Sequence, residues 1–237
     1  MSPRESSTAT QPVVPPADAP PQTPLGWAQL LIEHLQFENT AYRHKPTVVT
    51  WAGVNGATDY ASFADCSGFL NALLRQAHGL TADDFDAWLQ TRRPLARHYF
   101  DAIRARNKFS PLPRIAELQA DDIIAIRYPN GVPGDNTGHV LLVVEPPKPH
   151  AASRPKISDT TQWLVHIADS SRSGHGTRDT RHLPNGKFRA GAGAGFLRLY
   201  ADADDNVIGF AWSSAAGSAF YDATTRPLVV GRLRAEF

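Results

Sequence analysis

The chain has 237 residues, of which 42% are hydrophobic and 20% are charged, and its formal net charge is +1. This is a globular composition, and the small net charge gives no general attraction to nucleic acid or to an anionic membrane. The apolar runs are too short to span a bilayer, and a single cysteine excludes an intramolecular disulfide.

The first 24 residues differ from the rest, because they are rich in proline, serine, threonine and alanine. Such a composition predicts an extended or disordered leader over residues 1–24. A single folded domain is therefore expected over residues 25–237. It opens with an amphipathic helix whose apolar face includes Trp27, Leu30 and Leu31.

Cys66 is the only cysteine, and it lies in the segment Asp65-Cys66-Ser67-Gly68-Phe69 at the start of an apolar run. The helical spacing of the apolar residues predicts a helix that begins near Cys66 and ends near Gly79. Free N–H groups and the helix dipole favour a thiolate there and can hold an oxyanion. A lone cysteine is also often a small buried hydrophobe, so a nucleophilic role requires a base elsewhere.

Basic residues cluster between Arg92 and Lys108, where a nucleic-acid surface is one interpretation. The helical spacing of Leu95, Tyr99 and Ile103 instead favours the solvated face of an amphipathic helix. No nucleic-acid partner is therefore expected.

His139 is the candidate base. It follows Gly138 and precedes a continuous aliphatic run over residues 140–144, which predicts a buried strand with the histidine at its start. Gly138 leaves room for another chain or a substrate to approach closely. A histidine in this position is more often structural than catalytic. Together with Cys66 it forms a candidate Cys/His pair, because such partners meet in space and not in sequence.

The next predicted strand offers two residues, His166 and Asp169, that can orient the base. Asp169 shares the more apolar and therefore inward face of that strand. If residues 139–144 and 163–169 form an antiparallel hairpin, His139 faces Asp169, and the carboxylate can fix the imidazole as in a catalytic triad. The alternative is that Asp169 caps the turn that follows, with His166 in reserve for the third role.

Two later segments have other interpretations. His175 and His182, with Asp179 between them in a loop rich in glycine and arginine, match no zinc spacing, and a polar surface loop is predicted instead of a metal site. The alternating Ala/Gly run 190–195 lacks the ending of a phosphate loop and precedes the alternating segment 196–200. A flexible strand entrance is predicted there, and neither a metal nor a cofactor is expected.

The coarse order is helices from about 26 to 106, followed by strands near 122–128, 139–145, 162–168, 195–201, 206–213 and 227–234. This order predicts an α+β domain with an N-terminal helical part packed on an antiparallel sheet.

The quoted motifs resemble those of the NlpC-type cysteine peptidases, a papain-like group of bacterial cell-wall endopeptidases and amidases. Residues 65–69 resemble the nucleophile motif, residues 121–126 the strand that precedes the histidine, and residues 138–140 the histidine motif. The resemblance covers about residues 40 to 212. It departs from the family at Asp121, where the family usually has glycine. The third catalytic residue, preferred here as aspartate, is often histidine in the family.

The resemblance implies a papain-like fold and an enzyme that hydrolyses an amide bond in a peptidoglycan stem peptide or a related peptide. Cys66 would attack as a thiolate, His139 would take and return the proton, and Asp169 would hold the ring. Relatives that cut stem peptides use the residues beside the nucleophile to bind the substrate amine. Asp65 and Ser67 are therefore candidate substrate-binding residues, although both are also ordinary residues of a helix N-terminus.

Two alternatives to hydrolysis stay open: an acyltransferase or thioesterase with the same thiol chemistry, and a non-catalytic module that binds peptide or carbohydrate. We expect a monomer without a transmembrane segment. No apolar signal segment follows Met1, so the chain as given predicts an unexported protein, whereas the resemblance implies the periplasm or the cell surface. A native signal replaced by Met1 would reconcile the two.

Overall fold

The computed structural model describes residues 20–131 and 136–234 of the chain. Most of the expected leader lies outside these residues. The described chain enters its first helix, α1 (Pro24–His34), within one residue of the predicted domain start.

The helices come first in the sequence, as predicted. After α1 follow α2 (Cys66–His78), α3 (Ala82–Leu89) and α4 (Ala96–Arg104), with short 3-10 turns at Phe37–Asn39 and Ile115–Glu117. The predicted bounds of the cysteine helix are confirmed: α2 begins at Cys66 and ends before Gly79, which adopts a left-handed φ of 66°. The amphipathic helix predicted in the basic segment is also confirmed, because α4 buries Tyr99, Phe100 and Ile103.

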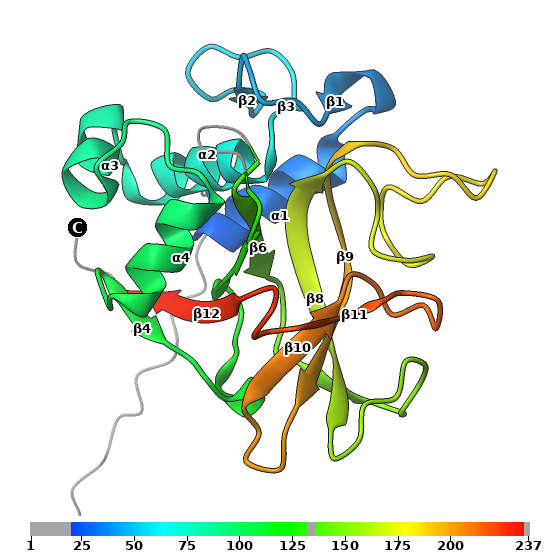
Figure 1. Cartoon of the computed structure of the whole chain (residues 1–237). Coiled ribbons are helices and arrows are strands. Elements are labelled where there is room, and N and C mark those ends of the chain that lie inside the picture. Colours follow the sequence, from blue (N-terminus) through cyan, green and yellow to red (C-terminus); the bar gives the residue numbers. More distant parts are fainter. Residues whose placement is uncertain (1–19, 132–135, 235–237) are drawn as a thin grey trace, which may run out of the picture.

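The strands form one large antiparallel sheet in the order β11-β10-β9-β8-β6-β5-β12-β4, with β7 paired to β8. The bounds are β4 (Phe109–Pro111), β5 (Ile123–Arg127), β6 (Gly138–Val143), β7 (Lys148–His150), β8 (Thr161–Ser171), β9 (Gly191–Ala201), β10 (Val207–Ala211), β11 (Phe220–Asp222) and β12 (Leu228–Leu233). The predicted α+β class is therefore confirmed, with the helices and the long strands on different sides of the molecule (Figure 1).

A second, smaller sheet contains β1 (Thr40–Ala41), β2 (Val48–Thr50) and β3 (Ala61–Phe63) in the order β1-β3-β2. It sits beside the start of α2 in Figure 1 and leads the chain into Cys66.

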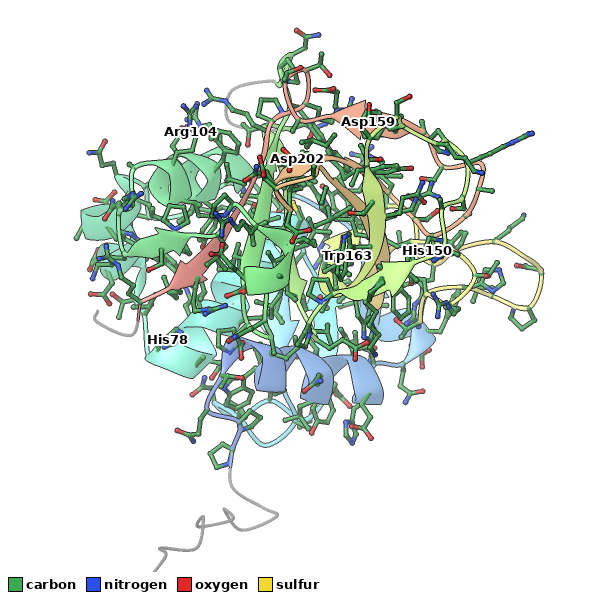
Figure 2. All side chains as sticks on the ribbon, turned by 90° about the horizontal axis from the view of Figure 1, so that it is seen from below. His78, Arg104, His150, Asp159, Trp163 and Asp202 are labelled. Atoms are coloured by element: carbon green, nitrogen blue, oxygen red, sulfur yellow. The ribbon has the colours of Figure 1, made fainter. Side chains whose placement is uncertain are left out.

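Two of the strands are longer than the sequence predicts. β8 continues to Ser171 and β9 already begins at Gly191, and the two pair over their whole length, with Asp169 opposite Gly193. The predicted flexible strand entrance over residues 190–195 is therefore wrong, because most of this run belongs to the strand itself. At the other end of β8, β7 pairs with its first residues and places His150 near Trp163 (Figure 2).

The core lies on both faces of the sheet, because alternate strand residues point to opposite sides. Ala125, Val140 and Leu142 pack against the helices, whereas Leu141 and Val143 pack with apolar residues of β8, β9 and β10. Since α2 lies on β6 and β8, its first residue is held beside the start of β6. No helix in the described part of the chain has the length and apolarity that a membrane span requires.

Candidate active site

Cys66 is the first residue of α2, and the residue is buried, at 5% exposure. The cap of the helix is Asp65, whose Oδ1 accepts from the Gly68 N–H at 2.6 Å. Cys66 is a neighbour of His139 on β6, since its charge and its side chain both act on the pKa of His139. The cysteine and the histidine predicted as a pair are therefore in contact, at the positive end of a helix dipole.

His139 is the second residue of β6, and Gly138 explains its placement. Gly138 has φ of 152°, and a side chain there would collide with the carbonyl group of Ile126 on β5. The close approach expected at this glycine is therefore that of a neighbouring strand. Because Ile126 pairs with His139, the ring is fixed where β6 enters the sheet.

Asp169 completes the row. His139 Nε2 donates to Asp169 Oδ2 at 2.6 Å, and the carboxylate is buried at 1% exposure. The alternative that Asp169 caps the turn after the strand is wrong, because Asp169 lies inside β8 and pairs with Gly193 of β9. His166, the reserve candidate, is instead engaged by Glu145, at 3.7 Å, and by the stacked ring of Phe196.

The electrostatics of His139 favour its charged form. Burial lowers the pKa of His139, but the Cys66 thiolate and the hydrogen bonds to Asp169 and Cys66 outweigh it, so the pKa lies well above its usual value. Since Nε2 serves Asp169, Nδ1 is the ring nitrogen left for the thiol. A cysteine, a histidine and a carboxylate in this order are the groups that thiol catalysis requires.

A buried ionic cluster that the sequence patterns do not predict lies next to Asp169. The loop between β8 and β9, predicted as a polar surface loop, buries His175, Asp179 and Arg181 at 3%, 5% and 0% exposure. His175 Nε2 lies 3.0 Å from Asp169 Oδ2, and Arg181 Nη2 lies 2.9 Å from Asp169 Oδ1 and 2.8 Å from Asp179 Oδ2. The surface-loop prediction is wrong because these charges pair with each other and with the sheet.

This cluster keeps Asp169 ionised. Burial raises its pKa, but the charges of Arg181 and His175 and the hydrogen bond from His139 lower it well below the usual value. The signal that sequence reasoning could have used is the alternation of glycines in β9. A side chain at Gly193 would collide with Arg181, and one at Gly195 with Asp179.

Asp65 and Ser67, the candidate substrate-binding residues, are both buried at 2% exposure. Oδ1 of Asp65 also accepts from the Ser67 hydroxyl at 2.9 Å, and Oδ2 contacts Arg93 Nη2 at 2.8 Å and His44 Nδ1 at 2.9 Å. Burial raises the pKa of Asp65, but these partners and the Gly68 N–H lower it below the usual value. Both carboxylate oxygens of Asp65 thus have partners within the protein. The role of Asp65 and Ser67 in substrate binding stays a prediction.

A cavity of about 310 Å³ opens beside His139. Three aromatic side chains line it, Tyr42, Tyr128 and Trp212, and Trp212 meets the His139 ring edge-on with centroids 5.4 Å apart. A narrow gap lined by Cys66 shares Tyr42 with this cavity. The volume is at the lower end for small-molecule sites, so one or two residues of a peptide would fit.

The charged lining of this cavity is basic. Its lining includes Arg172, stacked over Tyr42 at 5.3 Å from the ring centroid, together with His139 and His175. In the described part of the chain, no three His, Cys, Asp or Glu side chains are arranged as ligands of one metal ion.

Comparison with known proteins gives one relative of similar length. No family model matches the chain, and no solved structure matches it. The chain is 36% identical over 215 residues to uncharacterized protein R653 of Acanthamoeba polyphaga mimivirus, an alignment that covers 87% of this chain and 94% of that protein. The chain therefore belongs to the same protein family as R653.

Proposed function

We propose that the protein is a thiol hydrolase that cleaves an amide bond, with Cys66 as nucleophile, His139 as acid and base, and Asp169 as the residue that orients the imidazole. The observation that carries the proposal is the order Cys66, His139, Asp169: Cys66 lies close enough to act on the pKa of His139, and His139 Nε2 lies 2.6 Å from Asp169 Oδ2. The row stands at a helix N-terminus and beside a cavity.

The first half of the reaction forms a thioester. The Cys66 thiolate attacks the substrate carbonyl carbon, and the carbonyl electron pair moves to oxygen. The N–H of Cys66, one of the helix donors without an intrahelical acceptor, helps to bind this oxyanion. His139 then gives its proton to the amide nitrogen, the C–N bond breaks and the amine leaves.

The second half releases the acid. A water molecule takes the place of the amine. Neutral His139 accepts a proton from this water while the water oxygen attacks the thioester carbon. The C–S bond breaks, the carboxylic acid leaves and the thiolate–imidazolium pair is restored. Asp169 stays ionised throughout and stabilises the imidazolium through Nε2.

The papain-like fold is part of the same proposal. A helix that begins with the nucleophile and packs on the antiparallel strand that begins with the histidine is the arrangement the resemblance implies. The substrate class rests on the motif of residues 65–69, which points to a peptidoglycan stem peptide or a related peptide. The size of the cavity agrees with a short peptide segment.

The test uses a chromogenic ester, which reports acylation of a thiol without a known natural substrate. Wild-type protein should release the chromophore in a burst and carry the acyl group on Cys66, as seen by intact mass. Stem peptides are then screened for cleavage, with an added amine to distinguish hydrolysis from acyl transfer. Equal release by wild type and Cys66→Ala would contradict the proposal, and transfer to the amine as the main product would make the protein an acyltransferase.

A further inference from the structure

Asp169 is shared between two histidines, which the proposed chemistry does not require. His139 Nε2 and His175 Nε2 both contact Oδ2, at 2.6 Å and 3.0 Å, while Arg181 occupies the side of Oδ1. His175 also lines the cavity beside His139. Because His175 contacts the same carboxylate oxygen, it must change how strongly that oxygen stabilises the imidazolium form of His139.

The ring of His175 lies between two hydrogen-bond acceptors. Nδ1 lies 2.7 Å from the carbonyl oxygen of Trp212, and Nε2 lies 3.0 Å from the Asp169 carboxylate. Both partners are acceptors, because Asp169 is ionised. A neutral imidazole has one lone pair, which would face an oxygen lone pair at one of the two sites. Only a ring that donates from both nitrogens satisfies both acceptors.

Besides His139, two cationic side chains face the two carboxylates of the cluster, and Arg189 lies near enough for the charge of Arg181 to lower its pKa. The carboxylates of Asp169 and Asp179 are matched by Arg181 and the His175 imidazolium. Arg181 is fully buried, and Asp179 also accepts the backbone N–H of His175 at 2.8 Å. His139 thus meets a carboxylate whose charge is already partly compensated, and its own proton is held less tightly than an unshared Asp169 would hold it.

We propose that His175 is a positioning residue whose positive charge, acting through Asp169, keeps the His139 imidazolium acidic enough to return its proton to the leaving amine. This inference rests on the proposed function. A general acid works best when its pKa lies near the working pH, and a buried imidazolium beside a thiolate and a carboxylate would otherwise be too basic. His175 contacts the Asp169 carboxylate and opposes that negative charge.

Other titratable and charged groups also lie near Cys66 and His139, and they are the same in wild type and in the His175 variants. Burial raises the pKa of Tyr42 and of Tyr128, and the neighbouring Cys66 also raises both. The charge of Asp65 raises the pKa of Tyr42, and the charge of Arg172 lowers it. None of these four residues forms a hydrogen bond or ion pair with His175 in the described structure.

The experiment follows alkylation of Cys66 by iodoacetate against pH. This reagent is an anion and reacts fastest while His139 is charged, so the upper limb of the rate profile reports loss of the His139 proton. The variants are His175→Gln, which keeps an N–H donor but no charge, and His175→Ala. The matched control is His166→Gln, a half-buried histidine on β8 that contacts Glu145 and Phe196.

Both His175 variants should move the midpoint of the upper limb to higher pH, by roughly one unit or more, and the control should leave it in place. An unchanged or lower midpoint in His175→Gln would overturn the inference. If the variants do not fold, ¹⁵N spectra of the wild-type His175 ring decide the point: two protonated nitrogens at neutral pH support it, and a neutral tautomer refutes it. A wild-type profile without a thiolate plateau in acid would instead contradict the proposed function.

Discussion

Arg181→Met is expected to remove a large part of the stability of the protein. The guanidinium is fully buried and pairs with two buried carboxylates, Asp169 at 2.9 Å and Asp179 at 2.8 Å, while its Nη1 donates to the Gly191 carbonyl at 3.1 Å. Removing one partner of a buried ion pair typically destabilises by about 3–5 kcal/mol. This is a large part of the total stability of a domain, which is about 5–15 kcal/mol. At about 2–4 °C per kcal/mol for a chain of this size, the apparent melting temperature should fall by roughly 6–20 °C.

The loss should depend on pH in a defined direction. The cluster holds the pKa of Asp169 well below its usual value. Its ionised form therefore contributes stability above the unfolded-state pKa of about 3.9, and this contribution is lost as the pH falls through the folded-state pKa. Without Arg181 the buried carboxylates are destabilised while ionised. The difference between Arg181→Met and wild type should thus be large at neutral pH and shrink in acid.

Urea unfolding at pH 7 and at about pH 3, below the unfolded-state pKa of Asp, measures this difference. The control is Arg92→Met, which removes an arginine from an exposed ion pair with Asp83 and should change stability by less than about 1 kcal/mol. The reasoning is refuted if Arg181→Met unfolds within about 1 kcal/mol of wild type at pH 7, or if its deficit is the same at both pH values.

Three further outcomes are expected. Cys66→Ala should abolish ester turnover with an unchanged circular dichroism spectrum, and residual full activity would exclude the thiol mechanism. Asp169→Ala should lower kcat by about 10⁴-fold, as in other triads, whereas His166→Ala should stay within a few-fold; the reverse order would transfer the orienting role. Gly195→Ala places a methyl group against Asp179 and should destabilise by about 1–3 kcal/mol in thermal unfolding, whereas Gly217→Ala meets open space and should be neutral.

Local patterns in the sequence were enough to locate the elements of the site. A polar cap before an apolar helical run placed the start of α2 at Cys66, and a continuous aliphatic run placed His139 at the start of β6. The alternation of apolar residues in β8 put Asp169 on the face that meets His139. Each of these signals acts within about ten residues, which is the range over which periodicity and capping are informative.

The buried cluster behind Asp169 could not be predicted in the same way. His175 and Arg181 lie in a loop without periodicity, and charged residues are rarely buried unless they are paired. Their pairing depends on contacts between the loop and β8 that no local pattern encodes. The glycines at 191, 193 and 195 predict a flexible strand entrance, although in β9 the last two leave room for Arg181 and Asp179.

The central claim is that Cys66 and His139 form a thiolate–imidazolium pair. Its most direct test is the rate of Cys66 alkylation by iodoacetamide against pH, in the native protein and in His139→Ala. Rapid labelling in mildly acidic buffer that weakens without His139 is the predicted result. Labelling only after unfolding, or only near the free-thiol pKa of about 8.5, would contradict the account and identify Cys66 as a structural residue.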